Sequence, residues 1–259
     1  MTRADLDTGS ARDGASAQGS RMRLPDILSE LFPNGHSVTV EDGLVSGEGP
    51  FRGGRLAVIG IDGDTALGVD GACRLAADVL GVVRRGGQTP ILVAIDSDSQ
   101  RMSRRDELLG LNEYLAHLAK TLLLADAQGH PTIGLIYGHS AAGAFIATAL
   151  ATRILVGLPG ANPSVMDLPS VARVTKLPLD RLEAMAKDTP VFAPGLDNMV
   201  RTGAVQAVLD PDRPLAEQIA AVIDALPAED RRDRAGRERG GRPVAETIAA
   251  QVVRDAKLG

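Results

Sequence analysis

Short, uninterrupted apolar runs alternate along this chain with longer segments in which apolar residues recur every three or four positions. The runs predict strands, and the periodic segments predict amphipathic helices. The strands are expected at residues 58–62, 90–96, 132–137 and 153–156, and the helices at 70–85, 104–127, 177–187 and 215–226. Strands that are apolar throughout are buried on both faces, so we expect an α/β fold, with a parallel sheet covered by helices on each side.

The two ends of the chain differ in composition from its centre, which predicts three parts. Residues 1–22 are rich in Gly, Ser, Ala, Arg and Asp and are expected to form a disordered tail. Residues 23–227 are expected to form one α/β domain, with a β-hairpin at 36–56 and a short strand at 204–209. Residues 228–259 begin with a stretch of mixed charge, which is expected to be a solvated linker or surface. They end with an amphipathic helix, which is expected to pack on this chain or on a partner.

Composition narrows the function classes further. Of the 259 residues, 44% are hydrophobic, enough for a sizeable core, but only 2% are aromatic. The scarcity of stacking platforms and the net charge of −5 argue against nucleic-acid binding. A single cysteine and four scattered histidines leave no metal-ligand spacing, so no metal is expected. Neither a membrane-spanning segment nor a signal peptide is visible, so we expect a cytoplasmic protein without membrane contact.

The most informative stretch covers residues 131–147. An apolar, β-branched run ends at Gly138, small residues follow, and a helix-like pattern then begins. This predicts a buried strand, a tight turn and a helix N-terminus, where the amides of Ala142 and Gly143 lack intrahelical partners. These amides lie at the positive end of the helix dipole, so they would stabilise an oxygen atom that gains negative charge. The small side chains here would let a substrate approach the backbone closely.

Two enzyme classes use such a turn. The run Gly138-His139-Ser140-Ala141-Ala142 is similar to the Gly-x-Ser-x-Gly elbow of serine hydrolases, but in that fold the catalytic histidine follows the serine. Here no histidine follows Ser140, so we favour the class that uses the amides, with Ser140 as a small residue of the turn. Gly138 and Ser140 are then candidate substrate-binding positions. His139 either orients a substrate or serves as a structural hydrogen-bonding group.

A second half of the site is expected at the neighbouring strand end, because ligands of open α/β sheets bind beyond the carboxyl ends of strands. The strand that ends near residue 95 leads into a small, polar loop at 96–102. The backbone N–H of Ser99 or Gln100 is the candidate second oxyanion donor, and Arg101 is a candidate ligand for a carboxylate or phosphate. An alternative is that Asp98 and Ser99 cap the following helix, which does not exclude a role for the amides.

With both half-sites placed, the chain resembles the carboxyltransferase branch of the crotonase superfamily. More specifically, it resembles the gamma-subunit family of biotin-independent malonate decarboxylase. The segments that carry the resemblance are 95–100, 138–145, 159–166, 172–176 and 203–211, within a match from about residue 32 to 211. One departure is that Ala142 replaces the first glycine of the turn, which reduces the room for a substrate by a methyl group.

The resemblance implies a crotonase-like ββα superhelix and a pair with a homologous beta subunit. That pair would decarboxylate a malonyl thioester on an acyl-carrier protein to the acetyl thioester and carbon dioxide, while an alpha subunit exchanges malonate for acetate. The thiol would belong to the CoA-derived prosthetic group of the carrier protein, and this chain itself would hold no metal, biotin or other cofactor. By analogy, the beta subunit would hold the thioester and this chain would face the malonyl carboxylate.

Two other functions remain open from the sequence. A stand-alone crotonase-type hydratase or isomerase acting on acyl-CoA would need a carboxylate near the site, for which Asp96, Asp98 and Asp167 are the local candidates. Alternatively, the chain is a non-catalytic scaffold for the beta subunit. The intact amide turn favours a catalytic function, and an assay of the beta chain with and without this chain discriminates the scaffold from the catalytic subunit.

Overall fold

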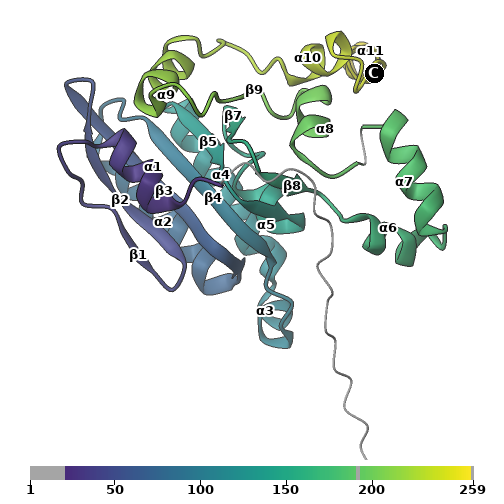
Figure 1. The fold of residues 1–259 in the computed structure, drawn as a ribbon, viewed down its shortest axis with the longest axis horizontal. Helices are drawn as coiled ribbons and strands as arrows, with labels where there is room; N and C mark the ends of the chain where they lie inside the picture. The colour runs from purple at the N-terminus through teal and green to yellow at the C-terminus, as the bar shows by residue number, and fades with distance from the viewer. Residues whose placement is uncertain (1–20, 191–192, 258–259) are drawn as a thin grey trace, which may run out of the picture.

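The computed structural model describes residues 21–190 and 193–257 (Figure 1). Its main sheet has the strand order β1-β2-β3-β4-β5-β7-β9. The three N-terminal strands pair antiparallel, and every pair from β3 to β9 is parallel, which confirms the predicted α/β class. The strands are β1 (Thr39–Glu41), β2 (Leu44–Phe51), β3 (Gly54–Leu67), β4 (Ile91–Gln100), β5 (Thr132–Ile136), β7 (Ile154–Gly157) and β9 (Ala207–Val208).

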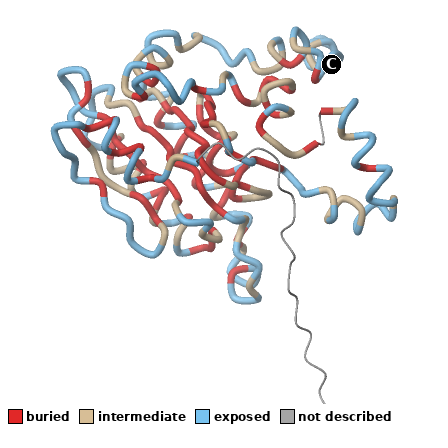
Figure 2. The backbone as a smooth tube through the Cα atoms, viewed as in Figure 1, coloured by how far each residue is buried: buried red, intermediate tan, exposed pale blue. Residues whose placement is uncertain are grey.

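Both faces of the central strands are buried, which explains their uninterrupted apolar sequences. In β3, Ile59 and Ile61 face the layer of α2 (Val69–Arg85) and α4 (Leu111–Ala127), because alternate strand residues point to opposite faces. Leu56 and Val58 face the opposite layer, which contains α1 and α9. Those two helices span Leu24–Leu31 and Leu215–Asp224. Figure 2 shows this buried sheet running through the centre of the molecule.

A second, two-stranded sheet converts this layered fold into a superhelix of β-β-α units. β6 (His139–Ala141) and β8 (Asn162–Ser164) pair parallel beside the main sheet. The chain runs from β5 through β6 into α5 (Ala142–Ala147), and then from β7 through β8 into α6 (Leu168–Thr175). The expected crotonase-like ββα arrangement is therefore present, and its small sheet lies at the carboxyl ends of the parallel strands.

The expected loop at 96–102 and the expected single helix at 104–127 are both wrong in detail. β4 continues to Gln100, because its last residues still pair with β3 after a register shift. The helical segment is divided into α3 (Arg104–Leu109) and α4 by Gly110, which has a left-handed φ of 80°. Ser103, and neither Asp98 nor Ser99, caps α3, because the Ser103 side chain accepts a hydrogen bond from the Asp106 amide at 3.1 Å.

The C-terminal half contributes helices that the periodicity predicts only partly. α6 and α7 (Leu179–Asp188) project away from the sheet in Figure 1, whereas α8 (Leu196–Arg201) precedes β9. The charged stretch contains a helix that was not predicted, α10 (Arg232–Glu238), and the expected C-terminal helix is α11 (Ala245–Ala256). Arg239 ties α10 to the domain by donating to the carbonyls of Val200 and Val205, so this stretch is not a detached linker.

The expected N-terminal tail is only partly covered by the structure. Residues 1–20 lie outside the described residues, but Arg21 and Met22 lie inside them, and Arg21 contacts the carboxyl edge of the sheet. Across 21–190 and 193–257, no helix combines the length and the apolar character that crossing a bilayer requires.

Candidate active site

The parallel pairing of β4 and β5 brings the two predicted half-sites together. Ile95 lies opposite Ile136, so the residues that follow both strands leave the sheet at the same edge. Gln100, the last residue of β4, and Gly143, in the first turn of α5, are in direct contact. The Gly143 N–H donates to the Gln100 side-chain oxygen Oε1 at 2.7 Å. Residues 43 positions apart therefore meet where the sequence predicted an oxyanion site.

The backbone before Gly143 directs its amide toward β4. Ala141 is extended, with φ −136° and ψ 160°, and Ala142 has a φ of 50°, in the left-handed region. That region is uncommon for a residue with a side chain, so Ala142 carries backbone strain at the position where the resembled family has glycine. As a residue of the first helical turn, Gly143 has no intrahelical acceptor for its N–H. The amide is thus available to an oxygen atom that approaches from outside the helix.

The contribution of Gln100 differs from the one expected. The backbone N–H of Ser99 or Gln100 was predicted as the second donor, but both residues belong to β4, and it is the side chain of Gln100 that reaches Gly143. Ser99 donates from Oγ to the Gln100 carbonyl at 3.2 Å. The Gln100 side-chain oxygen is thus the acceptor in front of the Gly143 amide. Any other oxygen atom has to displace it to bind this donor.

Ser140 is fully buried and has no histidine partner. Its Oγ lies 2.9 Å from the Oγ of Ser97, in a hydrogen bond between β6 and β4. A nucleophilic serine needs an adjacent base and access to substrate, and this hydroxyl has neither. The structure places Ser140 as a small, buried residue of the turn whose hydroxyl bonds Ser97, and its predicted part in substrate binding stays a prediction.

Arg101 lies at the same end of β4, but its charge is already engaged. Its side chain forms an ion pair with the buried carboxylate of Asp106 at 4.0 Å, and its backbone N–H donates to the Leu67 carbonyl at 2.8 Å. The Arg101 side chain is half exposed, and Asp106 also accepts a hydrogen bond from Arg105 at 3.1 Å. Among the described residues, no group of three or more His, Cys, Asp or Glu side chains is placed to hold a metal ion.

Sequence reasoning missed a polar network beside Gly138. The His139 backbone N–H donates to Asp96 Oδ1 at 3.0 Å, and Arg21 forms an ion pair with the same carboxylate. The Tyr137 hydroxyl donates to Asp62 Oδ1 at 2.7 Å. Burial, reinforced by the bond to Asp62, raises the pKa of Tyr137, so this hydroxyl stays protonated as a donor. No sequence pattern signals Arg21, because it follows a low-complexity segment.

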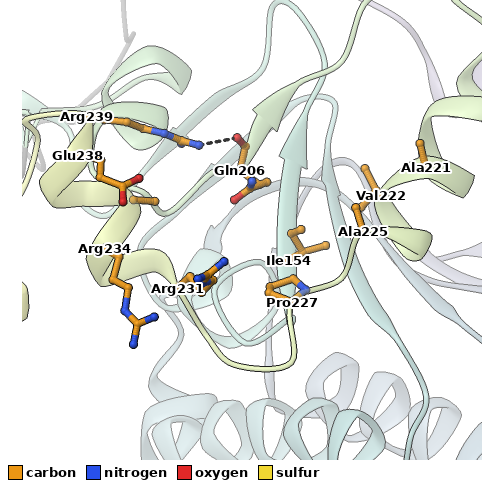
Figure 3. Close-up of a pocket in the computed structure, with 11 residues that line it drawn as sticks. Ile154, Gln206, Ala221, Val222, Ala225, Pro227, Arg231, Arg234, Glu238 and Arg239 are labelled. Atoms are coloured by element: carbon orange, nitrogen blue, oxygen red, sulfur yellow. Dashed lines mark hydrogen bonds between the residues drawn. The ribbon is translucent and has the colours of Figure 1, made fainter.

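A separate cavity of about 480 Å³ lies between the start of β7, α9 and α10 (Figure 3). Ile154, the first residue of β7, lines it together with apolar residues of α9. Arg231 and Arg239 border it on the side of α10, where Arg239 is held by the Gln206 carbonyl. None of the predicted site residues lines this cavity, so it is not part of the candidate active site.

Solved structures share this fold. A Pseudomonas malonate decarboxylase hetero-tetramer in complex with coenzyme A matches with a TM-score of 0.73 and 20% identity, covering 88% of this chain and 97% of that chain. A chain of the Pseudomonas MdcD-MdcE hetero-dimer matches with a TM-score of 0.68 and 22% identity, covering 86% and 97%. A transcarboxylase 12S structure matches with a TM-score of 0.65 and 17% identity, over 80% of this chain and 43% of that one. These likenesses establish the crotonase-like carboxyltransferase fold.

Sequence comparison points to the same group of proteins. The malonyl-S-ACP:biotin-protein carboxyltransferase MADD of Malonomonas rubra is 28% identical over 177 residues, which cover 63% of this chain and 61% of the relative's length. The family model described as malonate decarboxylase gamma subunit matches residues 63–256, from β3 to the end of α11, which include Gln100, Arg101 and the turn at 138–143. Because that match extends over well more than half of its length, the chain belongs to the malonate decarboxylase gamma subunit family.

Proposed function

We propose that this chain and a homologous beta subunit together decarboxylate malonyl-S-acyl-carrier-protein to the acetyl thioester and carbon dioxide. The observation that carries the proposal is the Gly143 amide, which turns out of α5 toward the end of β4 and already holds an oxygen atom at 2.7 Å. The family of the chain supplies the substrate class. The proposal includes an alpha subunit and an acyl-carrier protein in the complex, and a cytoplasmic location.

The chemistry requires stabilisation of an enolate. When the bond between the carboxylate carbon and the α-carbon breaks, carbon dioxide leaves. The electron pair of that bond stays on the α-carbon and is delocalised into the thioester carbonyl, so an enolate forms and its oxygen atom gains negative charge. A proton then adds to the α-carbon and completes the acetyl group. Donors aimed at an oxygen atom that gains charge are worth about 3 kcal/mol each. In this step, backbone amides serve without a metal or a biotin in this chain, and the thiol comes from the prosthetic group of the carrier protein.

In this proposal, some residues of this chain donate hydrogen bonds to the substrate, and others bound the space in which it binds. Gly143, with Ala142 before it, presents the amides of the turn, and Gln100 controls access to them. Gly138 and His139 lead from β5 into the turn, and the bond from the His139 amide to Asp96 fixes the backbone beside which the malonyl group would bind. In this proposal, the beta subunit binds the thioester at its carrier end, and this chain faces the malonyl group. The Gly143 amide then reaches the carbonyl oxygen that becomes the enolate, and Arg101 is the cation near the malonyl carboxylate.

The Malonomonas relative favours a second candidate function. Its name describes transfer of a carboxyl group from malonyl-S-ACP to a biotin protein, not direct release of carbon dioxide. The same amide turn suits that reaction, because the malonyl thioester again passes through an enolate. The two functions differ in the acceptor of the carboxyl group, so they are separable by an assay for biotin dependence.

The test is co-expression of the full-length chain with its beta subunit. Formation of the acetyl thioester from a malonyl thioester is measured for the pair and for each chain alone, with and without an added biotin-carrier protein, and with and without avidin. We expect activity in the pair alone, independent of the biotin protein and unaffected by avidin. Activity that requires the biotin protein and is lost with avidin would establish the biotin-dependent transfer. Full activity of the beta subunit alone would make this chain a scaffold, and turnover of an enoyl thioester by this chain alone would identify a hydratase.

Replacing Gln100 with alanine is expected to lower the KM for the malonyl thioester. The side-chain oxygen of Gln100 must leave the Gly143 amide before a substrate oxygen binds there, and a hydrogen bond of this kind contributes about 1 kcal/mol. The expected fall in KM is therefore about fivefold. Gln100→Glu is the matched control, since a carboxylate bonds the amide more strongly and should raise KM. A lower kcat with unchanged KM in Gln100→Ala would instead show that the side chain acts on the substrate itself.

A further inference from the structure

Arg21 reaches from the segment before α1 to the carboxyl ends of β4 and β5. Its Nε donates to the Tyr137 carbonyl at 3.1 Å, across a separation of 116 residues. Its Nη2 forms an ion pair with Asp96. The Arg21 guanidinium therefore binds a backbone carbonyl just after β5 and a carboxylate of β4 at the same time. A guanidinium can do so because its N–H donors point in several directions within one plane.

The Asp96 carboxylate extends this contact to the other side of Gly138. Its side chain is only 8% exposed, and its two oxygens are divided between partners. Oδ1 accepts the His139 backbone N–H at 3.0 Å, and Oδ2 faces Arg21. Arg21 and Asp96 thus bind residues 137 and 139, which flank Gly138.

Gly138 is covered by these two side chains. A Cβ added there would lie 1.8 Å from Nη2 of Arg21 and 2.1 Å from Oδ1 of Asp96. The ion pair therefore packs directly against the backbone of the turn and leaves no room for a side chain. The chain enters β6 at His139 and reaches Ala142 three residues later and Gly143 four residues later. The position of the Gly138 turn therefore sets the starting point of the amide turn.

Stability alone does not account for this arrangement. When an ion pair is buried, both charges lose their hydration. Apolar residues at the same positions often give the folded protein equal or greater stability. This pair lies instead at the carboxyl edge of a parallel sheet, where ligands of such folds bind. The Arg21 side chain is 43% exposed, so burial of its apolar atoms does not by itself hold it at this position. Its hydrogen bond and ion pair with the residues around Gly138 do.

We infer that Arg21 is a positioning residue for the active site: through Asp96 and Tyr137 it holds the Gly138 turn, and thereby the Gly143 amide, in the catalytic geometry. This inference rests on the proposed function for its catalytic readout. Arg21, directly before α1, is then a working part of the site.

The experiment compares Arg21→Met with Arg23→Met in the full-length chain paired with its beta subunit. Arg23, two residues away, forms an ion pair with Asp26 on the surface, has no other ion pair among the described residues, and serves as the matched control. Arg21→Met is expected to lower kcat for the malonyl thioester at least tenfold with KM changed less than about twofold, because small displacements of catalytic groups have large effects on rate. Arg23→Met is expected to retain both parameters.

A double variant separates positioning from stability. Arg21→Met leaves the buried Asp96 carboxylate without its cation, so Tm should fall, and adding Asp96→Asn removes that unpaired charge and should restore Tm. The kcat of the double variant is expected to remain low, because the Tyr137 carbonyl still lacks the hydrogen bond from Arg21. Recovery of kcat together with Tm would show a purely structural role and overturn the inference.

Hydrogen exchange gives a readout that does not depend on activity. The amides of residues 138–143 should exchange faster in Arg21→Met than in Arg23→Met, because the turn has lost a restraint. If the unmodified pair has no decarboxylase activity but exchange is accelerated, the proposed function fails and the positioning of the turn stands. Equal exchange in the two variants would overturn the positioning itself.

Discussion

Replacing Gly143 with proline is expected to lower kcat/KM for malonyl-thioester decarboxylation by about 100-fold or more, because it removes one oxyanion donor. Gly143 is the second residue of α5, a position where the N–H has no intrahelical acceptor. Proline is tolerated in the first turn of a helix, so the substitution deletes the amide hydrogen without removing a helical hydrogen bond. It also disfavours the left-handed φ of 50° at Ala142, so the comparison is made between variants of equal Tm. The measurement is steady-state kinetics of the two-subunit enzyme.

Gly143→Ala is the matched control for the proline variant. An added Cβ lies 3.0 Å from both Gln100 Oε1 and Leu115 Cδ1, so both substitutions displace the same neighbours by a few tenths of an ångström. Only the proline variant lacks the amide hydrogen. Equal kinetic losses in the two variants, at equal Tm, would show that the Gly143 amide does not stabilise the transition state.

Replacing Gly60 with alanine is expected to destabilise the protein by about 3 kcal/mol, because it overpacks the centre of the sheet. Gly60 pairs with Ala94 between the parallel strands β3 and β4, and an added Cβ would lie 2.0 Å from the Ala94 carbonyl oxygen. The obstructing atoms belong to the backbone of the next strand, which moves only if the pairing opens. The expected fall in Tm is about 10 °C, measured by thermal unfolding.

Gly81→Ala is expected to change Tm in the opposite direction, by stabilising the protein. Gly81 lies inside α2, and a Cβ there meets no atom within 4 Å. Alanine in a helix interior is about 0.5–1 kcal/mol more favourable than glycine, so Tm should rise by a few degrees. A stable Gly60→Ala variant would show that β3 and β4 are farther apart than in this structure.

The parts of the fold that the sequence predicts well are those that short-range periodicity defines. The helix expected at 70–85 is α2, Val69–Arg85, and the strand expected at 132–137 is β5, Thr132–Ile136. The amide turn after β5 was also predictable, because the run of small residues before a helical pattern is a local signal. Such elements depend on contacts between residues that are close in sequence.

Other local features were misread because tertiary contacts override local preference. Residues 96–100 are polar and small and resemble a loop, yet pairing with β3 keeps them in β4. Gly110 lies within a periodic pattern that predicts one helix, but it adopts a left-handed conformation and separates α3 from α4. In both cases, the neighbouring element in space decides the backbone conformation.

The sequence by itself determined the α/β class, the succession of elements and the presence of an amide turn at Ala142 and Gly143. The tertiary structure decided which side chains reach that turn. Gln100 meets Gly143 from 43 residues away, and Arg21 meets Tyr137 from 116 residues away. These contacts exist because parallel strands bring their carboxyl ends to one edge of the sheet. Periodicity reports on neighbours along the chain, whereas the active site is assembled from neighbours in space.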